Sequence, residues 1–508
     1  MAALDNGIIT AALTTLTSSF GVTPTWGAWS ITIYTLGLAV SVPIVGKMSD
    51  RFGRKRLFLL EVFLFGLGSL LVALSPNFEW FLIARMLQAL GGGGIFIIAS
   101  AYVLNVFPRE SHGKALGMLG GMNGMAAVLG PNIGSFILEL TGSWHWLFLI
   151  NLPIALFLVI FGWKLISEQV ESKQSKIDWI GISLLSLGIL FFMYGLTKLD
   201  GVNVLRSLTQ FNVCGWFVGG ITCLIILGVL EIRLKRNGGD PFLPVTLFGF
   251  VRFRLSLVLG FLSGAILAAV IFIPSFVEQF LGVDSATAGY WFTPLALASG
   301  IGAGGGGSLV DKKGSVFTLI LASTLCLFGF SLFPLWVSEG WQLIVASCIV
   351  GLGFGMMLGA PINVIATEQA QNDKGIALST LSLSRQIGLT LFPTLYAGFL
   401  ARSLIDWSHD ELVPSIKYLD VPMQYSGGEG MIINSAGLKS MLAMIPDQAS
   451  SIKQHLALTF HSAVQHGYDG LYWSAVGLSG VALLVTLMFF MTKVPSVLSG
   501  DENRKTKK

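Results

Sequence analysis

Residues 46–55 read GKMSDRFGRK, and this segment decides the fold because a degenerate copy of it occurs later in the chain. The copy at residues 307–314 reads GSLVDKKG, so glycine, acid, base and glycine recur 261 residues downstream. In a second match, residues Gly113 and Pro131 correspond to Gly375 and Pro393, at an offset of 262 residues. Two independent matches at nearly one offset indicate an internal duplication. We therefore predict two structurally similar halves.

The composition places both halves in a membrane. Of the 508 residues, 53% are hydrophobic and 11% are charged, and the mean hydropathy is +0.75. Soluble domains carry about 25% charged residues, so a soluble enzyme, a disordered chain and a fibrous chain are excluded. A helix that crosses the bilayer needs about 20 apolar residues. Fourteen segments meet this requirement: 1–20, 26–46, 57–74, 78–104, 115–138, 147–165, 179–197, 211–230, 255–277, 288–310, 315–336, 341–365, 376–400 and 471–492.

The repeat offset assigns these spans to the two halves. It relates span 2 to span 10 and span 5 to span 13, so each half has six spans, and spans 7 and 8 are an inserted pair. We predict an all-α integral membrane protein with fourteen transmembrane helices, in two pseudo-symmetric six-helix bundles plus an inserted helix pair. Parallel halves of this kind are typical of one class of secondary transporter. The expected domains are an N-terminal bundle (1–166), the inserted pair with its linkers (167–254), a C-terminal bundle (255–492) and a basic tail (493–508).

The basic residues predict the topology. Most of the 31 Lys and Arg residues lie in alternate connections, on the side that holds residues 47–56. By the positive-inside rule these connections are cytoplasmic, and so are both termini of this multi-pass protein of the cell (plasma) membrane. The long loop 401–470 is then expected outside, with amphipathic stretches near 435–445 and 450–466 lying on the membrane surface.

Residues 46–55 resemble a loop signature, G-x-x-x-D-R-x-G-R-K, of the major facilitator superfamily. Residues 85–89 (RMLQA) are similar to the R-x-x-Q-G motif of span 4 in that family, with Ala89 in place of glycine. Residues 130–135 (GPNIGS) resemble its antiporter motif G-P-x-x-G-G in span 5, with Ser135 in place of the last glycine.

Two further stretches resemble the fourteen-span drug:proton antiporter branch of this superfamily. Residues 4–9 (LDNGII) are similar to its span 1 signature L-D-x-T-I-V. Residues 144–153 resemble its W-R-W-x-F-x-I-N-x-P stretch, with His145 where arginine is usual. The resemblance extends over essentially the whole chain, and it implies a multidrug efflux transporter.

The resemblance implies that Asp5 and Arg85 couple transport to protons. A charged side chain within a span is costly unless it is paired or functional. The alternatives are that Asp5 stabilises the helix dipole at a cytoplasmic helix start and that Arg85 is a structural clamp. Only four residues precede Asp5, whereas a mid-membrane position needs about seven to ten, so we expect a start upstream of Met1 or a shortened first span. Arg385 corresponds to Asn123 in the repeat and is expected to be structural.

The loop signature predicts a cytoplasmic gate, formed by Gly46, Asp50, Arg51, Gly53 and Arg54. We expect Asp50 to pair with a base and with a helix N-terminus, which holds the outward-open state. The copy around residue 311 has two lysines and is expected to be weaker; a generic basic loop is the alternative.

The antiporter motif, Gly130, Pro131 and Gly134, predicts a kinked and closely packed span 5. The family adds a role in alternating access.

The predicted substrate pocket consists of Gln88, Met122, Asn123 and Glu278. Methionine suits a promiscuous pocket, although contact with the core or with lipid is the favoured explanation for Met122. Glu278 could attract a cation, although it is also consistent with a solvated acid.

We therefore predict a proton-coupled antiporter that exports apolar, cationic drugs or toxic compounds by alternating access. The alternatives are an exporter of a native metabolite, lipid or osmolyte with incidental drug efflux, a uniporter or importer, and a membrane enzyme or receptor. The sequence has no ATP-binding G-x-x-x-x-G-K-[ST] motif and no metal or nucleophile motif, so we expect no enzyme activity and no cofactor other than the proton gradient. The expected partners are small amphipathic substrates, protons and the lipid bilayer, without nucleic acid, and the chain is expected to act as a monomer.

Overall fold

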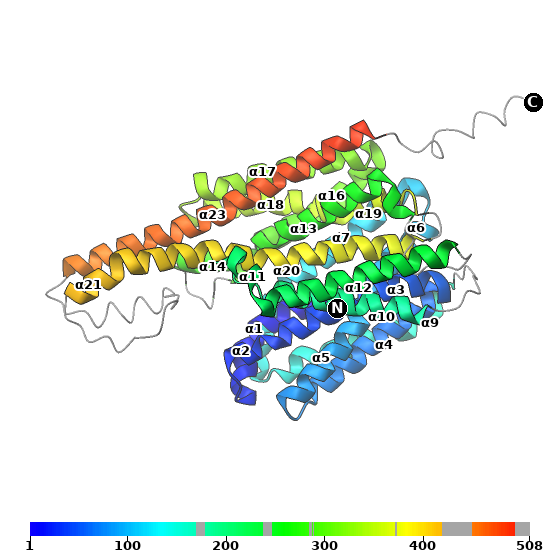
Figure 1. Cartoon of the computed structure of the whole chain (residues 1–508), viewed down its shortest axis with the longest axis horizontal. Helices are drawn as coiled ribbons and strands as arrows, with labels where there is room; N and C mark the ends of the chain where they lie inside the picture. The colour runs from blue at the N-terminus through cyan, green and yellow to red at the C-terminus, as the bar shows by residue number, and fades with distance from the viewer. Residues whose placement is uncertain are drawn as a thin grey trace, which may run out of the picture.

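The computed structural model describes residues 1–168, 178–236, 246–283, 287, 289–370, 373–418 and 450–492. Every secondary-structure element within these ranges is a helix, and the long helices run roughly parallel to one another (Figure 1). A helix satisfies all of its own backbone hydrogen bonds, as a chain that crosses a bilayer requires.

The helices of the first half are α1 (Ala2–Phe20), α2 (Pro24–Gly27), α3 (Trp29–Phe52), α4 (Arg54–Ala73), α5 (Phe78–Gly92), α6 (Ile95–Val106), η1 (Arg109–Ser111), α7 (His112–Thr141), α8 (His145–Leu149) and α9 (Asn151–Leu165). They are followed by α10 (Trp179–Thr197), α11 (Val204–Thr209) and α12 (Phe211–Arg236). The second half contains η2 (Leu247–Gly249), α13 (Val251–Val270), α14 (Ile273–Gln279), η3 (Gly289–Phe292), α16 (Thr293–Lys313), α17 (Ser315–Leu335), α18 (Gly340–Gly359), α19 (Pro361–Thr367), α20 (Lys374–Trp407), η4 (Ser408–Leu412), α21 (Val413–Tyr418) and α23 (Ser450–Met491).

Eleven helical segments in the described ranges are long and apolar enough to cross a membrane, or twelve if the bent helix α7 is included. The predicted number was fourteen. Helices α1 and α16 coincide with the predicted spans 1–20 and 288–310 but are not among the twelve. Their composition explains the difference, because α1 contains Asp5 and Asn6 in addition to its threonines, and α16 is rich in glycine.

The glycines of α16 allow it to pack closely on two neighbours. A Cβ atom on Gly117 of α7 would lie 2.8 Å from the Cα of Gly307, and one on Gly302 would lie 2.9 Å from the Cα of Leu352 in α18. Real Cβ atoms essentially never come this close to other atoms, so both contacts require glycine. Helix α16 therefore lies between α7 and α18, and close packing accounts for its low apolarity.

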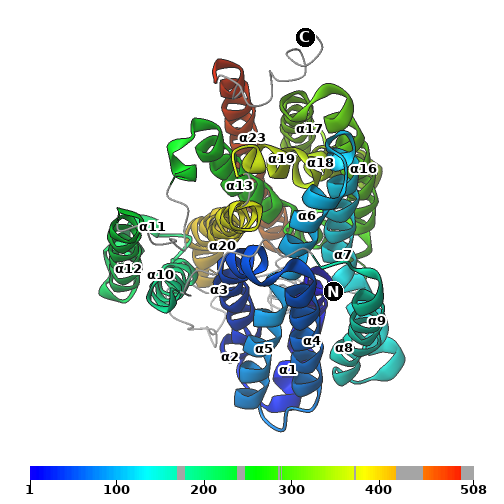
Figure 2. The same ribbon diagram turned by 90° about the vertical axis from the view of Figure 1, so that its right-hand side faces the viewer.

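The two halves pack on each other through two pairs of helices, each with one helix from either half. Helix α3 packs on α20, and α16 packs on α7. The repeat offset relates α3 to α16 and α7 to α20, so the two contacts are equivalent. Helices α10 and α12 pack on each other at the side of the molecule, where α10 also contacts α3 and α20 (Figure 2).

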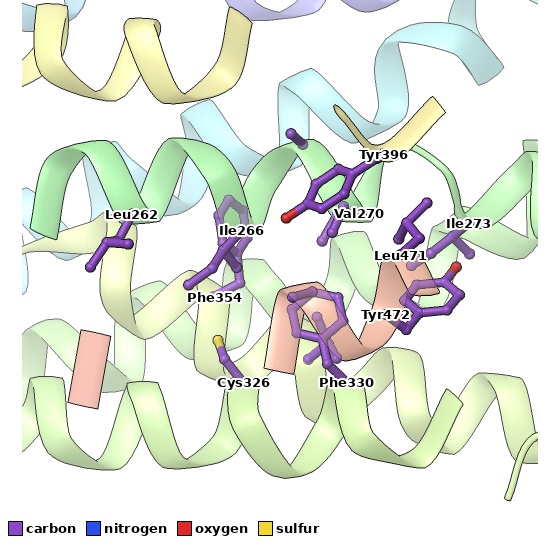
Figure 3. Close-up of a cluster of buried hydrophobic side chains, with 14 of the residues drawn as sticks. Leu262, Ile266, Val270, Ile273, Cys326, Phe330, Phe354, Tyr396, Leu471 and Tyr472 are labelled. Carbon is purple, nitrogen blue, oxygen red and sulfur yellow. The ribbon is translucent and has the colours of Figure 1, made fainter. Parts of the chain in front are cut away.

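The largest buried cluster lies within the second half. It joins Leu262, Ile266 and Val270 of α13 to Phe330 of α17 and Tyr472 of α23 (Figure 3). The cluster packs the second-half helices on one another.

The last two long helices extend beyond the predicted spans. Helix α20 runs to Trp407, and α23 starts at Ser450, so the two run side by side away from the bundle (Figure 1). Trp407 Nε1 donates to Thr459 Oγ1 at 2.9 Å, and Ser403 Oγ donates to the Ala463 carbonyl oxygen at 2.6 Å. The prediction that 450–466 lies on the membrane surface is therefore wrong, because this stretch continues the last span and packs on α20. The stretch 435–445 lies outside the described residues.

Candidate functional site

Asp5 of α1 and Arg85 of α5 form an ion pair in the first half. Arg85 Nη1 donates to Asp5 Oδ2, and both side chains are 0% exposed. A buried charge without a partner is strongly destabilising, so each of these residues requires the other. The structure thus brings together the two residues to which the sequence assigned proton coupling.

Neutral side chains surround this pair. Gln88, one helical turn after Arg85, accepts from Arg85 Nη1 at 2.7 Å and donates to Asp5 Oδ1 at 2.9 Å. Its amide also donates to Ser69 Oγ of α4 at 2.8 Å. Asn151, at the start of α9, donates to Asp5 Oδ1 at 3.1 Å. We refer to these five residues as the Asp5 network, which ties four helices together.

Aromatic rings enclose the network. The Arg85 guanidinium lies 4.1 Å from the ring centroid of Tyr34 (α3) and 5.5 Å from that of Phe148 (α8). All five members of the network are buried, so the ion pair is shielded from solvent and its attraction is strong. Addition of a proton to Asp5 would remove that attraction, whereas the contacts of Arg85 with Gln88 and the two rings do not depend on the Asp5 charge.

The antiporter motif lies beside α1. A Cβ atom on Gly130 would lie 2.7 Å from the Cα of Gly7 and 2.8 Å from the carbonyl oxygen of Leu4, so glycine is required at this contact. Helix α7 bends by 44° between its segments Arg109–Ala127 and Leu129–Thr141. Pro131 explains the bend, because it has no N–H to donate to the carbonyl of Ala127 four residues earlier. Gly134, the third motif residue, is buried in the same helix.

The loop signature connects α3 to the start of α20 in the other half. Asp50 Oδ1 accepts from Arg54 Nη2 at 2.9 Å, and its Oδ2 accepts from the backbone N–H of Ile376 at 3.3 Å. A Cβ atom on Gly46 would lie 2.8 Å from the carbonyl oxygen of Gly375. We call Asp50, Arg54 and the N-terminus of α20 the first latch.

The other two residues of the predicted gate lie next to the latch. Gly53 has a φ of 97°, which favours glycine, and it ends α3 and begins α4. Arg51 lies over the Phe52 ring, at 5.5 Å from its centroid, and joins no ion pair with a described residue.

A second latch occupies the equivalent position in the repeat. Asp311, at the end of α16, accepts from the backbone N–H groups of Gly113 and Lys114 at 2.7 and 2.8 Å. Its glycine turn, Gly314, has a φ of 87°, which resembles that of Gly53. The sequence predicts a weaker copy because the signature is degenerate. Asp311 accepts two backbone hydrogen bonds from the other half, whereas Asp50 accepts one longer backbone hydrogen bond from the other half and a second hydrogen bond from Arg54.

The predicted substrate-pocket residues are scattered. Gln88 belongs to the Asp5 network, whereas Met122 of α7 is 61% exposed and Asn123 is exposed beside it. Glu278 lies half-buried on α14. Within the described part of the chain, no hydrogen bond or ion pair joins Gln88, Asn123 and Glu278 to one another.

The sequence alone does not place Ser69, Tyr34 or Asn151 in the site. Asn151 belongs to a stretch that resembles a family motif, which was the one available signal for it. Ser69 and Tyr34 are ordinary residues for a membrane helix, and only packing reveals their contacts with the network. Among the described residues, no group of three or more His, Cys, Asp or Glu side chains could hold a metal ion.

Curated proteins resemble this chain over most of its length. The Uncharacterized MFS-type transporter YfiU of Bacillus subtilis is 56% identical over 482 residues, which cover 94% of this chain and 92% of that protein. Multidrug resistance protein 3 of Bacillus subtilis is 30% identical over 406 residues, or 78% of this chain and 76% of that protein. The Multidrug resistance protein B homolog of Mycobacterium tuberculosis is 25% identical over 451 residues, or 86% of this chain and 80% of that protein.

Solved structures share the fold. The human organic anion transporter MFSD10 superposes with a TM-score of 0.54 at 13% identity, with 96% of each chain covered. The proton:xylose symporter XylE superposes with a TM-score of 0.53 at 13% identity, with 97% of this chain and 93% of that chain covered. The family model described as Major Facilitator Superfamily matches residues 1–393. The chain therefore belongs to the Major Facilitator Superfamily and is a multi-pass membrane transporter rather than an enzyme.

Proposed function

We propose that this transporter exports apolar, cationic compounds across the plasma membrane in exchange for protons. In this proposal α1 and α16 also cross the bilayer, which gives fourteen spans with both termini in the cytoplasm. Two curated relatives carry the name multidrug resistance protein, which supports drug-like compounds as substrates.

The observation that carries the proposal is the buried ion pair between Asp5 and Arg85. A carboxylate in this position can alternate between a charged form that holds Arg85 and a neutral form that does not. A change of protonation therefore alters how α1 is held against α5. This coupling gives a proton the means to drive a conformational change.

Helix α7 connects the Asp5 network to the cytoplasmic side. It contacts α1 at Gly130, close to Asp5, and its N-terminus is held by Asp311 of the second half. The bend near Pro131 lies between these two contacts. We propose that a change in the protonation of Asp5 moves α7 about this bend. The movement of α7 then makes or breaks the second latch, which closes or opens the cytoplasmic side.

The proposal is tested with ethidium in everted membrane vesicles. An imposed proton gradient, acidic inside, should drive ethidium uptake by the wild type, and an uncoupler should abolish it. The Asp5→Asn variant should lose at least about tenfold of this uptake at unchanged protein level, because its side chain cannot exchange a proton.

Glu139→Gln is the matched control, because Glu139 is an exposed acid on α7. It should transport ethidium like the wild type. Uncoupler-sensitive uptake by Asp5→Asn at the wild-type rate, or wild-type uptake that ignores the gradient, would refute proton antiport.

A further inference from the structure

The candidate span Phe78–Val106 is broken near Gly94, between α5 and α6. In an unbroken helix the Gly94 N–H would donate to the carbonyl oxygen of Leu90, four residues earlier. Here the Gly94 N–H donates to Glu61 Oε2 of α4 at 3.0 Å. The Leu90 carbonyl oxygen accepts from Ser41 Oγ of α3 at 2.7 Å. Side chains of two neighbouring helices therefore replace both partners of the missing backbone hydrogen bond.

The packing of α3 requires the two glycines at this break. A Cβ atom on Gly93 would lie 2.8 Å from the Cβ of Ser41. A Cβ atom on Gly94 would lie 2.8 Å from the Cβ of Val45. Real Cβ atoms essentially never come this close to other atoms, so both positions need glycine, which also weakens a regular helix. Packing and hydrogen bonding therefore place the break at the same point.

Glu61 is a buried carboxylate that the Asp5 network does not use. It lies seven residues after the start of α4 at Arg54, or about 10 Å along the helix, and it is 3% exposed. It forms no ion pair with a described residue, in contrast to Asp5. A charged carboxylate in such a place is costly, and a bound proton removes that cost. Glu61 is therefore suited to exchange a proton.

Other titratable side chains lie on the helices that pack on α4, but none of them forms a hydrogen bond or ion pair with Glu61 in the described part of the chain. The charged ones are Lys47, Asp50 and Arg51 of α3, Glu79 and Arg85 of α5, and Lys164 of α9. The others are Tyr34 of α3, Tyr102 of α6 and His145 of α8. The protonation of Glu61 therefore acts directly on its hydrogen bond with Gly94.

The corresponding span of the second half is broken in a different way. Pro361 begins α19 directly after α18, and proline has no N–H with which to continue the helix. In the first half, the Gly94 N–H and the Leu90 carbonyl are both present and can bond to each other when their side-chain partners withdraw. The break at Gly94 is therefore reversible, whereas the break at Pro361 is permanent.

We propose that Glu61 is a second proton-binding residue of this transporter and that its charged form maintains the break at Gly94. A charged acceptor makes a stronger hydrogen bond than a neutral one. When a proton from water binds the carboxylate, the bond from the Gly94 N–H weakens and the N–H returns to the Leu90 carbonyl. The span then straightens.

Straightening of the span moves α6, which contacts the second half. Lys374 Nζ of α20 donates to the Leu104 carbonyl oxygen and to Asn105 Oδ1, both at 3.0 Å, at the end of α6. The break thus lies between the part of the span that belongs to the Asp5 network and a contact between the halves. The proposal rests on the proton-coupled export above and extends it by a second carboxylate that responds to the gradient.

Infrared difference spectra test whether Glu61 binds a proton. The purified full chain in detergent is compared at about pH 6 and about pH 9, because exposed carboxylates are charged at both values. A buried carboxyl group that loses its proton in this interval gives a band in the carbonyl-stretch region. Glu61→Gln should remove part of this band, both in the wild type and in Asp5→Asn. The control Glu139→Gln, which changes an exposed acid of α7, should keep the whole band.

Spin labels test whether the break responds to that proton. The labels are attached to Val106→Cys at the end of α6 and to Lys164→Cys at the end of α9, after the native cysteines are replaced by alanine. Helix α6 has 12 residues, or about 18 Å, so a change of about 20° in the bend moves its end by about 6 Å. The label distance, measured by electron paramagnetic resonance, should change by at least about 3 Å between the two pH values. Glu61→Gln should abolish this change, and Asp5→Asn should retain it.

Ser41→Ala provides a second variant if Glu61→Gln does not fold. It leaves Glu61 in place and removes the donor to the Leu90 carbonyl, which is then free to accept from the Gly94 N–H. The infrared band should remain, and the label distance at the higher pH should shift toward its value at the lower pH.

An infrared band that is unchanged in folded Glu61→Gln would overturn proton binding at this residue. A label distance that responds to pH equally in the wild type and in Glu61→Gln, or that is unaffected by Ser41→Ala, would overturn its control of the break. Both measurements use neither substrate nor gradient, so a failure here is distinct from a failure of proton-driven ethidium uptake.

Discussion

At the scale of single residues, Arg85 interacts through both the charge and the shape of its side chain. Its Nη1 donates to Asp5 and to Gln88, and its planar group lies over the Tyr34 ring. Lysine keeps the charge but has neither the planar group nor the fixed directions of its donors. We predict that Arg85→Lys reduces gradient-driven ethidium uptake at least about tenfold, at a protein level within about twofold of the wild type.

Arg56→Lys is the control for this substitution, because Arg56 has a side chain that is 77% exposed and pairs with Glu168 at 3.5 Å on the surface. Surface ion pairs contribute about 0–1 kcal/mol, so this variant should behave like the wild type. If Arg85→Lys transports normally, then the charge alone is sufficient and the hydrogen bonds to Gln88 are dispensable.

The charged members of the network could be predicted from sequence, whereas its neutral members could not. Asp5 and Arg85 stand out because a charged side chain in an apolar span is costly unless it is paired or functional. Ser69 is a small polar residue of a kind common in membrane helices, and its hydrogen bond from Gln88 depends on how α4 meets α5. Glu61 is 3% exposed and accepts from the Gly94 N–H, because the break between α5 and α6 frees that group.

At the scale of elements, Pro131 gives α7 its bend and costs it a hydrogen bond. Replacement by alanine restores an N–H for the Ala127 carbonyl and favours a straight helix. We predict that Pro131→Ala raises the thermal melting temperature of the purified protein and reduces gradient-driven ethidium uptake at least about fivefold. The two effects have one cause, because a straight α7 is more stable but cannot transmit movement from α1 to α16.

Pro334→Ala is the matched control, because Pro334 lies in the last turn of α17, a helix that packs mainly on α18 and α23. It should leave transport within about twofold of the wild type. A Pro131→Ala variant that is stabilised and transports normally would show that the bend is incidental.

Apolar length predicted where most spans lie, and glycine and proline explain the breaks within them. Segment 78–104 was predicted as one span, and Phe78–Val106 is one candidate span in which Gly93 and Gly94 separate α5 from α6. Pro361 likewise starts α19 as a new helix after α18, because proline favours the first turn of a helix over its interior. The extension of α20 to Trp407 could not be read from hydropathy, because contacts with α23 stabilise it.

At the scale of the whole molecule, the two latches are exchanged between the halves. Asp50 of the first half holds the start of α20, and Asp311 of the second half holds the start of α7. The repeat relates Asp50 to Asp311 and Ile376 to Lys114, so the two interactions are equivalent by the internal symmetry. Their symmetry could be predicted from the duplication, but their relative strength could not, because it depends on the number of N–H groups that each carboxylate reaches.

We predict that each latch acts on the opposite half, and that the second latch is the stronger. A hydrogen bond to a charged group contributes about 1.5–3 kcal/mol, and Asp311 accepts two such bonds from α7. In hydrogen–deuterium exchange of the purified protein, Asp311→Ala should therefore accelerate exchange in residues 112–120 at least about tenfold. Asp50→Ala should accelerate exchange in residues 374–382 by a smaller factor.

Glu110→Ala is the control for this comparison, because Glu110 is an exposed acid two residues before the start of α7 and should leave both segments unchanged. If Asp311→Ala accelerates exchange only within α16, the carboxylate stabilises its own helix and does not hold the halves together. If Asp50→Ala has the larger effect, then Arg54 contributes more than the backbone hydrogen bonds. If exchange becomes faster only in the opposite half in both variants, then both copies of the repeat contribute to holding the two halves together at the end of the molecule that carries the latches.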